Sequence, residues 1–250
     1  MEQNFKVKSL AKAVMVLEAF TNGQPELGVT EISQMLHLQK STVHNIVSTY
    51  ESLGYLVQNK ETSKYYLGVK LLRFSYIINN HMGFHKFFLP YMKKIAEKLN
   101  ETVFMGIPHD GEVLYMEAQV PAGTMISRNI LGERAPMYCT GLGKAMLAFL
   151  PEKERQQHIP KKFTRYTENT ILSEEELLGD LQKTRERGYA IDNMEHEYGV
   201  KCFAVPIFGN DGHVIAAISV SGPSLRFDDN SIQKNAEILE QILKPIQNTL

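Results

Sequence analysis

The first seventy residues follow a fixed order of helical and strand-like patterns, and this order constrains the fold more than any other feature of the chain. Apolar residues recur at helical spacing in three stretches between residues 9 and 53. Two alternating runs follow, 55–58 and 64–67, and the polar segment 59–63 joins them as a hairpin loop. Helix, helix, turn, helix and hairpin is the order of elements in a winged helix-turn-helix.

Local signals place the three helices of this head. The first helix is predicted over 9–20, and the second is a short helix that runs from a cap at Thr30 to Leu36. The third helix is predicted over 40–53. Gly54 follows it and is expected in the left-handed conformation that ends many helices.

The outward face of the third predicted helix carries short hydrogen-bonding side chains and none of the Glu–Lys pairs of a typical solvated helix. Such side chains suit contact with base edges and phosphates in the major groove of DNA. Six lysines and six glutamates through residue 68 leave the head neutral, so attraction for phosphate depends on Lys40, Lys60 and Lys64. A module that binds protein instead of DNA is the alternative. The outward residues are Ser41, Thr42, His44, Asn45, Ser48 and Thr49.

The rest of the chain continues as helix and then changes to strands. Helices are predicted over 69–79 and 85–99, with a break at 81–83, and the apolar character of this region suits dimerisation. Strands joined mainly by hairpins, with helices between blocks, indicate an α+β domain with a largely antiparallel sheet. The predicted strands are 102–107, 112–119, 124–130, 201–208 and 213–221, and the predicted helices run from 137 or 138 to 150, from a Ser173–Glu176 capping box to Gly188, and over 229–248.

Composition places the chain among ordinary globular proteins, and 250 residues suffice for one large or two small domains. A net charge of −1 excludes a strongly basic protein that coats nucleic acid. Two cysteines make no disulfide framework and favour a reducing compartment. The N-terminus shows no signal-peptide pattern, and the longest apolar stretch, 214–220, is far shorter than the ~20 residues of a membrane helix. We therefore expect a cytoplasmic protein without a membrane partner.

A candidate pocket follows from the register of the last predicted hairpin. A tight symmetric turn over 209–212 pairs Cys202 with Ser219 and Val200 with Ser221. Because side chains alternate along a strand, this register places Cys202, Ser219 and Ser221 on one side of the sheet. Buried hydroxyls without partners cost ~1–3 kcal/mol each, so either backbone neighbours or a ligand must satisfy them. The sequence leaves both alternatives open.

Two further segments carry residues with chemistry. In 138–144, a threonine and two glycines open a helix whose N-terminal amides attract a carboxylate or phosphate, and Cys139 there is a candidate activated thiol. Close packing of helix on sheet explains the same small residues equally well. In 192–197, Asp, Glu and His lie close together, but their spacing is not that of the His-Glu-x-x-His zinc motif. We predict a polar loop there and no metal site.

Seven motifs occur in the order found in one known family. They are SLAKA at 9–13, KSTVH at 40–44, LGYL at 53–56, GERAPMYCTGLGKA at 132–145, RGYAIDN at 187–193, EHEYGV at 195–200 and ISVSGP at 218–223. On these motifs the chain resembles the IclR family of bacterial transcriptional regulators, from about residue 8 to residue 246. Several ordered motifs in one chain are far more specific than a helix-turn-helix alone.

The resemblance implies an α+β chain with a winged helix-turn-helix DNA-binding domain at 1–68, a linker helix at 69–84 and a GAF-like α/β effector domain with a mainly antiparallel sheet at 85–250. It implies a regulator, more often a repressor, that binds palindromic operators in double-stranded DNA as a dimer or tetramer and needs no cofactor. Its effector is a small, often carboxylate-bearing metabolite. The family's effector residues fall on Asp192, Cys202, Ser219 and Ser221 and on the backbone of Gly141 and Leu142, with Ile126 at the same cavity.

One position departs from the family. Many relatives carry Arg where this chain has Asn45. Asn pairs with adenine and Arg with guanine, so we expect an operator richer in A·T at that contact, and a gentler salt dependence. For DNA binding we expect Thr42, His44 and Asn45 at major-groove edges, Lys40 and Ser41 at phosphate, and Lys60 and Lys64 in the wing at the backbone or minor groove.

Two other classes of protein are alternatives to a DNA-binding regulator. An enzyme would use Cys139 or Cys202 as nucleophile with His196 as base, and would need a Cys–His approach within hydrogen-bond reach. A protein-binding winged helix would show no salt-dependent affinity for DNA.

Overall fold

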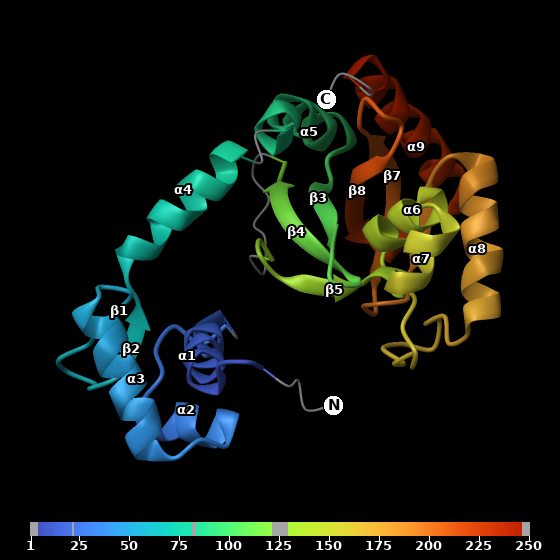
Figure 1. The fold of residues 1–250 in the computed structure, drawn as a ribbon. Coiled ribbons are helices and arrows are strands. Elements are labelled where there is room, and N and C mark those ends of the chain that lie inside the picture. The colour runs from blue at the N-terminus through green and yellow to red at the C-terminus, as the bar shows by residue number, and fades with distance from the viewer. Residues whose placement is uncertain (1–4, 22, 82–83, 122–129, 247–250) are drawn as a thin grey trace. The chain divides into compact units, whose positions relative to one another are not determined.

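The computed structural model of the chain describes residues 5–21, 23–81, 84–121 and 130–246 (Figure 1). The chain divides into two compact units, Met1–Met82 and Gly83–Leu250. This boundary falls inside the segment that the sequence suggests as the link between two domains. Of the helices that the structure describes, none is long and apolar enough to cross a membrane.

The first unit contains the three helices and the hairpin that the sequence predicts for the head, residues 1–68. Its elements are α1 (Lys8–Glu18), a 3-10 turn (Ala19–Thr21), α2 (Val29–Leu36), α3 (Lys40–Ser52), β1 (Leu56–Gln58) and β2 (Tyr65–Leu67). Val43 and Val47 lie one turn apart on α3 and are fully buried in the core of the head. Leu27 exchanges two backbone hydrogen bonds with Tyr65, which ties the segment before α2 to the hairpin.

The helix ends in the head show how local chemistry sets the boundaries. Gly54 has φ +78°, in the left-handed region, as predicted. Thr30 is not the cap of α2, contrary to the prediction. Gly28 is the cap, and its amide donates to Glu31 Oε2 at 2.6 Å. A carboxylate from the first turn therefore satisfies the exposed end of the helix in place of a capping hydroxyl.

After the hairpin the first unit continues beyond the head as a 3-10 turn (Val69–Leu71) and α4 (Leu72–His81). This confirms the helix predicted over 69–79, with a tighter first turn. The break predicted at 81–83 includes residues outside the described part of the chain. Leu72 and Tyr76 on α4 are 68% and 66% exposed, so this helix carries apolar surface that the head itself does not cover.

The second unit is a six-stranded sheet with helices. Its described strands pair antiparallel throughout, in the order β5-β4-β3-β8-β7-β6 (Figure 1). The strands are β3 (Thr102–His109), β4 (Glu112–Gln119), β5 (Arg134–Pro136), β6 (Ala190–Asn193), β7 (Val200–Phe208) and β8 (Val214–Pro223), and the helices are α5 (Phe84–Leu99), α6 (Gly141–Phe149), α7 (Glu152–His158), α8 (Glu174–Arg187) and α9 (Asp229–Leu243).

Alternation along the strands gives this sheet two buried faces. Phe203, Val205 and Ile218 pack in one cluster with residues of α5 and α9. Ala204 and Ala217 pack in a second cluster with residues of α6 and α8. The polar positions of β7 and β8 alternate with the first group, so they face the side of the sheet that α6 covers.

Several boundaries differ from the prediction. The helix expected from 137 or 138 begins at Gly141, because Met137–Cys139 forms a 3-10 turn. The capping of α8 is as predicted, since Ser173 Oγ accepts from the amide of Glu176 and Gly188 ends the helix. The last helix ends at Leu243 and is followed by a 3-10 turn (Lys244–Ile246), and the predicted residues beyond it lie outside the described part.

Three short elements have no counterpart in the prediction. They are β5, β6 and α7, which contain only three, four and seven residues. So short a segment shows too little periodicity to be distinguished from a loop. The predicted strand 124–130 lies almost wholly outside the described residues, and Ile130, its last residue, is not in a strand.

The β7–β8 hairpin pairs in a register two residues away from the predicted one. Cys202 lies opposite Ser221 and not Ser219, and Val200 lies opposite Pro223 and not Ser221. The turn is one residue longer than a tight symmetric turn, and a bulge beside it adds a second residue. Because the two displacements make an even number, Cys202, Ser219 and Ser221 still share one side of the sheet.

Candidate functional site

The described residues of the second unit form a cavity of about 420 Å³ on the α6 side of the sheet. Residues of all six strands, the start of α6 and the segment after β6 make its wall. This volume is in the range of small-molecule sites. Of the predicted effector residues, Ile126 lies outside the described part of the chain. The other six all line the cavity: Gly141, Leu142, Asp192, Cys202, Ser219 and Ser221.

Strand pairing places four polar side chains in one row on the sheet side of the cavity. Asp192 on β6 pairs with Cys202 on β7. Cys202 pairs in turn with Ser221 on β8, and Ser221 with Thr102 on β3. Directly opposed residues point to the same face of a sheet, and the Cys202 thiol donates to Ser221 Oγ at 3.1 Å. The sequence prediction misses Thr102, because only the β3–β8 pairing brings it to this row.

The start of α6 is fixed by its own side chains. Thr140 is the cap, as its Oγ1 accepts from the amide of Gly143 at 3.2 Å and donates to the carbonyl of Pro136 at 2.8 Å. A Cβ on Gly143 would lie 2.3 Å from backbone atoms of Met137, so no other residue fits there without a shift of the backbone. Close packing therefore accounts for Gly143.

The neighbouring glycine brings the helix end to the polar row. A Cβ on Gly141 would lie 3.3 Å from the Cβ of Cys202, which shows how closely α6 approaches β7. The first amides of a helix have no acceptor within the helix and carry partial positive charge. At the cavity wall these are the amides of Gly141 and Leu142. This end of α6 thus serves both packing and the cavity.

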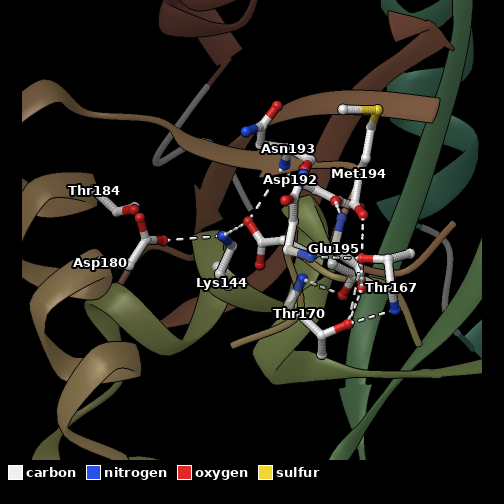
Figure 2. Close-up of polar contacts among 12 residues, drawn as sticks. Lys144, Thr167, Thr170, Asp180, Thr184, Asp192, Asn193, Met194 and Glu195 are labelled. Carbon is white, nitrogen blue, oxygen red and sulfur yellow. Dashed lines mark hydrogen bonds and ion pairs between the residues drawn. The ribbon is translucent and has the colours of Figure 1, made fainter. Parts of the chain in front are cut away.

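A buried ion cluster lies behind the cavity, and we call Lys144, Asp180, Asp192 and Glu195 the Lys144 cluster. Lys144 on α6 is fully buried, and its Nζ lies 2.5 Å from Glu195 Oε1 and 3.0 Å from Asp180 Oδ2 (Figure 2). Asp192 Oδ1 accepts from the amide of Glu195 at 2.7 Å, so the cluster reaches the cavity wall. Burial opposes the ammonium ion, but the carboxylates of Glu195 and Asp180 raise the pKa of Lys144 above its ordinary value. Lys144 is therefore a cation at neutral pH.

Two threonines hold the segment that carries Glu195. The hydroxyl of Thr170 donates to the Glu195 carbonyl at 2.7 Å, and that of Thr167 to the Met194 carbonyl at 2.6 Å (Figure 2). The polar loop predicted over 192–197 is wrong at its first two positions, since Asp192 and Asn193 belong to β6. Glu195 lies in the loop that follows, but it is buried. Among the described residues, no group of three or more His, Cys, Asp and Glu side chains is arranged to hold a metal ion.

The two cysteines are poor candidates for an activated thiol. Burial, together with the nearby carboxylate of Asp192, raises the pKa of both Cys139 and Cys202 above the usual range of a thiol. Of the two alternatives for Cys139, the activated thiol is therefore disfavoured, because loss of water outweighs the helix dipole at this buried position.

In the head, α3 presents the surface that the sequence predicts. Its buried side is apolar, and Thr42 is partly buried. The hydroxyl of Thr49 donates to the carbonyl of Asn45 at 2.7 Å, so that hydroxyl is engaged within the helix. The exposed residues among those expected to contact DNA are Lys40, Ser41, His44 and Asn45 on α3 and Lys60 in the hairpin loop.

Lys64 has a partner inside the head. Its Nζ lies 2.7 Å from Glu31 Oε1, while Glu31 Oε2 accepts from the amide of Gly28. One carboxylate thus joins the start of α2 to the hairpin, and the charge of Lys64 is already matched there. The same paired hydrogen bonds lower the pKa of Glu31.

A second carboxylate, which the sequence prediction misses, fixes the tip of the hairpin. Glu26 Oε1 accepts from Asn59 Nδ2 at 2.8 Å, and Glu26 Oε2 accepts from the hydroxyl of Thr62 at 2.9 Å. Asn59 Oδ1 in turn accepts from the amide of Glu61. The hydrogen bonds from Asn59 and Thr62 lower the pKa of Glu26. No local sequence pattern predicts the role of Glu26, because its partners lie more than thirty positions further along the chain.

Comparison with known proteins gives matches over both units. The family model of the bacterial transcriptional regulator IclR C-terminal domain matches residues 78–248, and that of the IclR helix-turn-helix domain matches residues 9–60. The HTH-type transcriptional regulator XynR of Escherichia coli (strain K12) is 33% identical over 236 residues, which cover 94% of each chain. The chain belongs to the IclR family. The sequence resemblance is thereby confirmed.

Solved structures of the IclR family share the fold. The crystal structure of the Thermotoga maritima IclR matches with a TM-score of 0.75 and 28% identity, over 95% of this chain and 96% of that one. An IclR homolog from Microbacterium hydrocarbonoxydans, complexed with 4-hydroxybenzoate, matches with a TM-score of 0.80 and 23% identity, over 95% and 99% of the chains. The α+β fold class, with a winged helix-turn-helix and a second domain built on an antiparallel sheet, is confirmed.

Membership in the IclR family decides between the classes of protein. The head is a DNA-binding helix-turn-helix, and the chain regulates transcription. Relatives named for their activity are regulators and not enzymes, which excludes the cysteine-dependent enzyme. The raised pKa values of both thiols agree with this result.

Proposed function

We propose that this IclR-family chain represses transcription in the cytoplasm, that it binds palindromic operators as a dimer or tetramer, and that a small carboxylate-bearing metabolite in the cavity changes its affinity for DNA. The proposal rests on one observation: the polar row and the start of α6 line the same cavity. Hydroxyl, thiol and carboxyl groups on the sheet lie across from helix amides that attract an anion. Such a wall suits a small acid that bears further polar atoms.

The chemistry of the wall supports a position for the effector. Its carboxylate lies at the amides of Gly141 and Leu142, and the hydroxyls of Ser219 and Ser221 bind its remaining polar atoms. Asp192, Cys202 and Ile126 complete the proposed site. The IclR homolog complexed with 4-hydroxybenzoate has the same fold, which supports an acid of this size.

The DNA contacts are proposed from exposure and chemistry. Thr42, His44 and Asn45 contact base edges, and Lys40 and Ser41 contact phosphate. In the hairpin, Lys60 contacts the DNA backbone or the minor groove. Lys64 remains 39% exposed and contributes to that contact while its pair with Glu31 holds the hairpin in place.

We also propose which segment of the chain performs each function. Residues 1–68 bind DNA, 69–84 link, and 85–250 bind the effector. The exposed apolar side chains of α4 support self-association through the linker. Effector binding can shift DNA affinity only by the difference between the effector's affinities for two arrangements of the heads, typically ~1–3 kcal/mol. The linker is the segment that would transmit this difference. The exposed apolar side chains of α4 that would support self-association are Leu72, Phe74, Tyr76 and Ile77, all at least 46% exposed.

The experiment removes the two hydroxyls of the row. Ser219→Ala with Ser221→Ala should abolish the response of operator binding to effector and leave operator binding itself intact, because no element of the head changes. Isothermal calorimetry with a panel of small organic acids measures effector affinity, and fluorescence anisotropy of labelled operator measures DNA binding. Ser224→Ala, outside the cavity, is the matched control. Unchanged effector affinity in the double variant would contradict the proposed site.

A further inference from the structure

The cavity that is proposed to hold an acid is itself rich in carboxyl groups. Asp192 lines it, and Glu195 and Asp180 lie behind Asp192 around Lys144 (Figure 2). Among the described residues, Lys144 is the one cation that forms an ion pair with any of these carboxylates. With all three ionised, the Lys144 cluster carries excess negative charge in buried surroundings, which is costly. An acid anion that enters beside it adds a further like charge.

We propose that the cavity takes up its acid together with one proton from water, and that the carboxyl of Asp192 carries this proton and donates a hydrogen bond to the acid. The inference rests on the proposed function. The proton leaves hydronium or a protonated buffer molecule, whose bond to it breaks as the new O–H bond of the carboxyl forms. A monoanion that binds with one proton leaves the net charge of the cavity unchanged. Asp192 is then a specificity-determining residue, because a neutral carboxyl selects a hydrogen-bond acceptor such as a carboxylate.

The surroundings of Asp192 favour the neutral carboxyl. Asp192 is only 4% exposed, and the amide of Glu195, three residues later, donates to its Oδ1, so the carboxyl of Glu195 belongs to the same cluster. Glu195 Oε2 is also buried without a hydrogen-bond partner among the described residues, so that charge is incompletely compensated. Burial first, and the charge of Glu195 second, raise the pKa of Asp192 to about 7, against the opposing effect of Lys144. Asp192 therefore titrates within the neutral range of pH.

Three other titratable groups around Asp192 carry no charge at neutral pH. Tyr115 from β4, Cys139 from the turn before α6 and Cys202 from β7 are neutral, because burial raises the pKa of each. The remaining titratable or charged wall residues are two carboxylates, one guanidinium, one imidazole and one phenol. They are Glu133, Glu197, Arg134, His196 and Tyr198.

The test follows the pH dependence of binding. The probes are 4-hydroxybenzoate and gluconate, an aromatic and a polyhydroxylated acid whose carboxyl groups stay ionised between pH 6 and 8. If only the protonated site binds, the dissociation constant should be about tenfold larger at pH 8 than at pH 6, because the protonated fraction falls by that factor around a pKa of 7. Calorimetry in buffers of different ionisation enthalpy should show uptake of about half a proton at pH 7, approaching one proton per acid at pH 8.

Two variants test whether Asp192 is the residue that carries the proton. Asp192→Asn keeps an oxygen that accepts from the Glu195 amide and places an amide donor where the carboxyl stood, so it should bind the acid with a flat pH profile. Glu197→Gln is the matched control, since it removes an exposed carboxyl of the same wall and should keep the wild-type slope. The titration of the unmodified chain stands even where a variant fails to fold.

Each outcome decides one question. A tenfold pH effect with proton uptake, lost in Asp192→Asn and kept in Glu197→Gln, supports the inference. Binding that is independent of pH, or that strengthens as pH rises, overturns it and leaves the effector site in place. If neither acid binds at pH 6 or pH 8, the assignment of the cavity to a carboxylate ligand fails, and the inference fails with it.

Discussion

The head and the second unit use ion pairs in opposite ways. In the head, Lys64 and Glu31 form a pair in which the two side chains are 39% and 41% exposed. In the second unit, Lys144 and Glu195 form a pair in which they are 0% and 8% exposed. An exposed pair replaces water contacts with little net gain, whereas a buried pair cannot lose one partner without leaving a charge away from water. The exposed pair should therefore contribute little to stability, whereas loss of one partner of the buried pair should be costly.

The largest expected effect comes from removing the buried cation. Lys144→Met leaves the carboxylates of Glu195 and Asp180 without their cation and should cost the second unit ~3–5 kcal/mol of unfolding free energy. Lys64→Met applies the same substitution to the exposed pair and should shift the unfolding of the head far less. Differential scanning calorimetry of the two variants measures both effects.

A rescue variant separates charge from packing. Adding Glu195→Gln to Lys144→Met removes one of the uncompensated carboxylates and should recover part of the lost stability. Equal unfolding shifts for Lys144→Met and Lys64→Met would show that burial does not distinguish the two pairs. Failure of the rescue would attribute the loss to the packing of the lysine side chain.

The next largest effect tests how tightly the cavity wall is built. Gly143→Ala places a Cβ against the backbone of Met137 and should cost ~1–3 kcal/mol, because the start of α6 must move. The same shift should weaken effector binding through the amides of Gly141 and Leu142. Gly179→Ala on α8, where a Cβ meets nothing within 4 Å, is the control and should stabilise the helix by ~0.5–1 kcal/mol. Two alanine variants of equal stability would contradict this account.

The head was largely predictable because its signals are local. Periodicity and the left-handed Gly54 give the extent of α3 within one residue, and they give the face that Ser41 and Asn45 share. The error at Thr30 has a physical cause, since a hydroxyl cap and the Glu31 carboxylate satisfy the same helix end. The partners of Glu26 were not predictable, because they depend on where the hairpin folds back.

The cavity was predictable only in part because it is assembled from distant segments. Alternation along β7 and β8 placed Cys202, Ser219 and Ser221 on one side although the register was wrong, since an even shift preserves the side. Asp192 came from the resemblance to the IclR family alone. Lys144 reads as one more polar residue of a helix, and nothing local shows that it is fully buried against β6 and α8.

A smaller and purely functional effect is expected on the exposed face of α3. Asn45→Arg should move base preference from adenine toward guanine at one operator position, by ~1–3 kcal/mol of discrimination. The added cation should steepen the slope of log affinity against log salt by about 0.9 if it meets a phosphate. Because Asn45 is exposed, the unfolding of the head should not change. Titration of operators substituted at each position tests this, and an unchanged preference everywhere would remove Asn45 from the reading surface.

The smallest effect is expected at Glu26, whose hydrogen bonds to Asn59 and Thr62 lower its pKa at the surface of the head. A folded pKa below the unfolded one means that the contribution is complete above the ordinary pKa of 4.5 and is lost as pH falls through the folded value. Hydrogen exchange of the amides of 59–64, corrected for intrinsic rates, should therefore accelerate in acid. Glu26→Gln should show the faster exchange already at pH 7.

Asp192 should respond to acid with the sign opposite to that of Glu26. Measuring both residues in one chain therefore tests the comparison between the two units directly. The folded pKa of Asp192, about 7, lies above its ordinary value of 3.8, so its contribution to stability is complete below pH 3.8 and is lost as pH rises through 7. Acidification from pH 7.5 to 5.5 should stabilise the second unit through Asp192 and leave the hairpin of the head unchanged. In Asp192→Asn this gain should be absent, while the acid response of the hairpin at Glu26 should remain. A gain that persists in Asp192→Asn would assign it to another group of the Lys144 cluster.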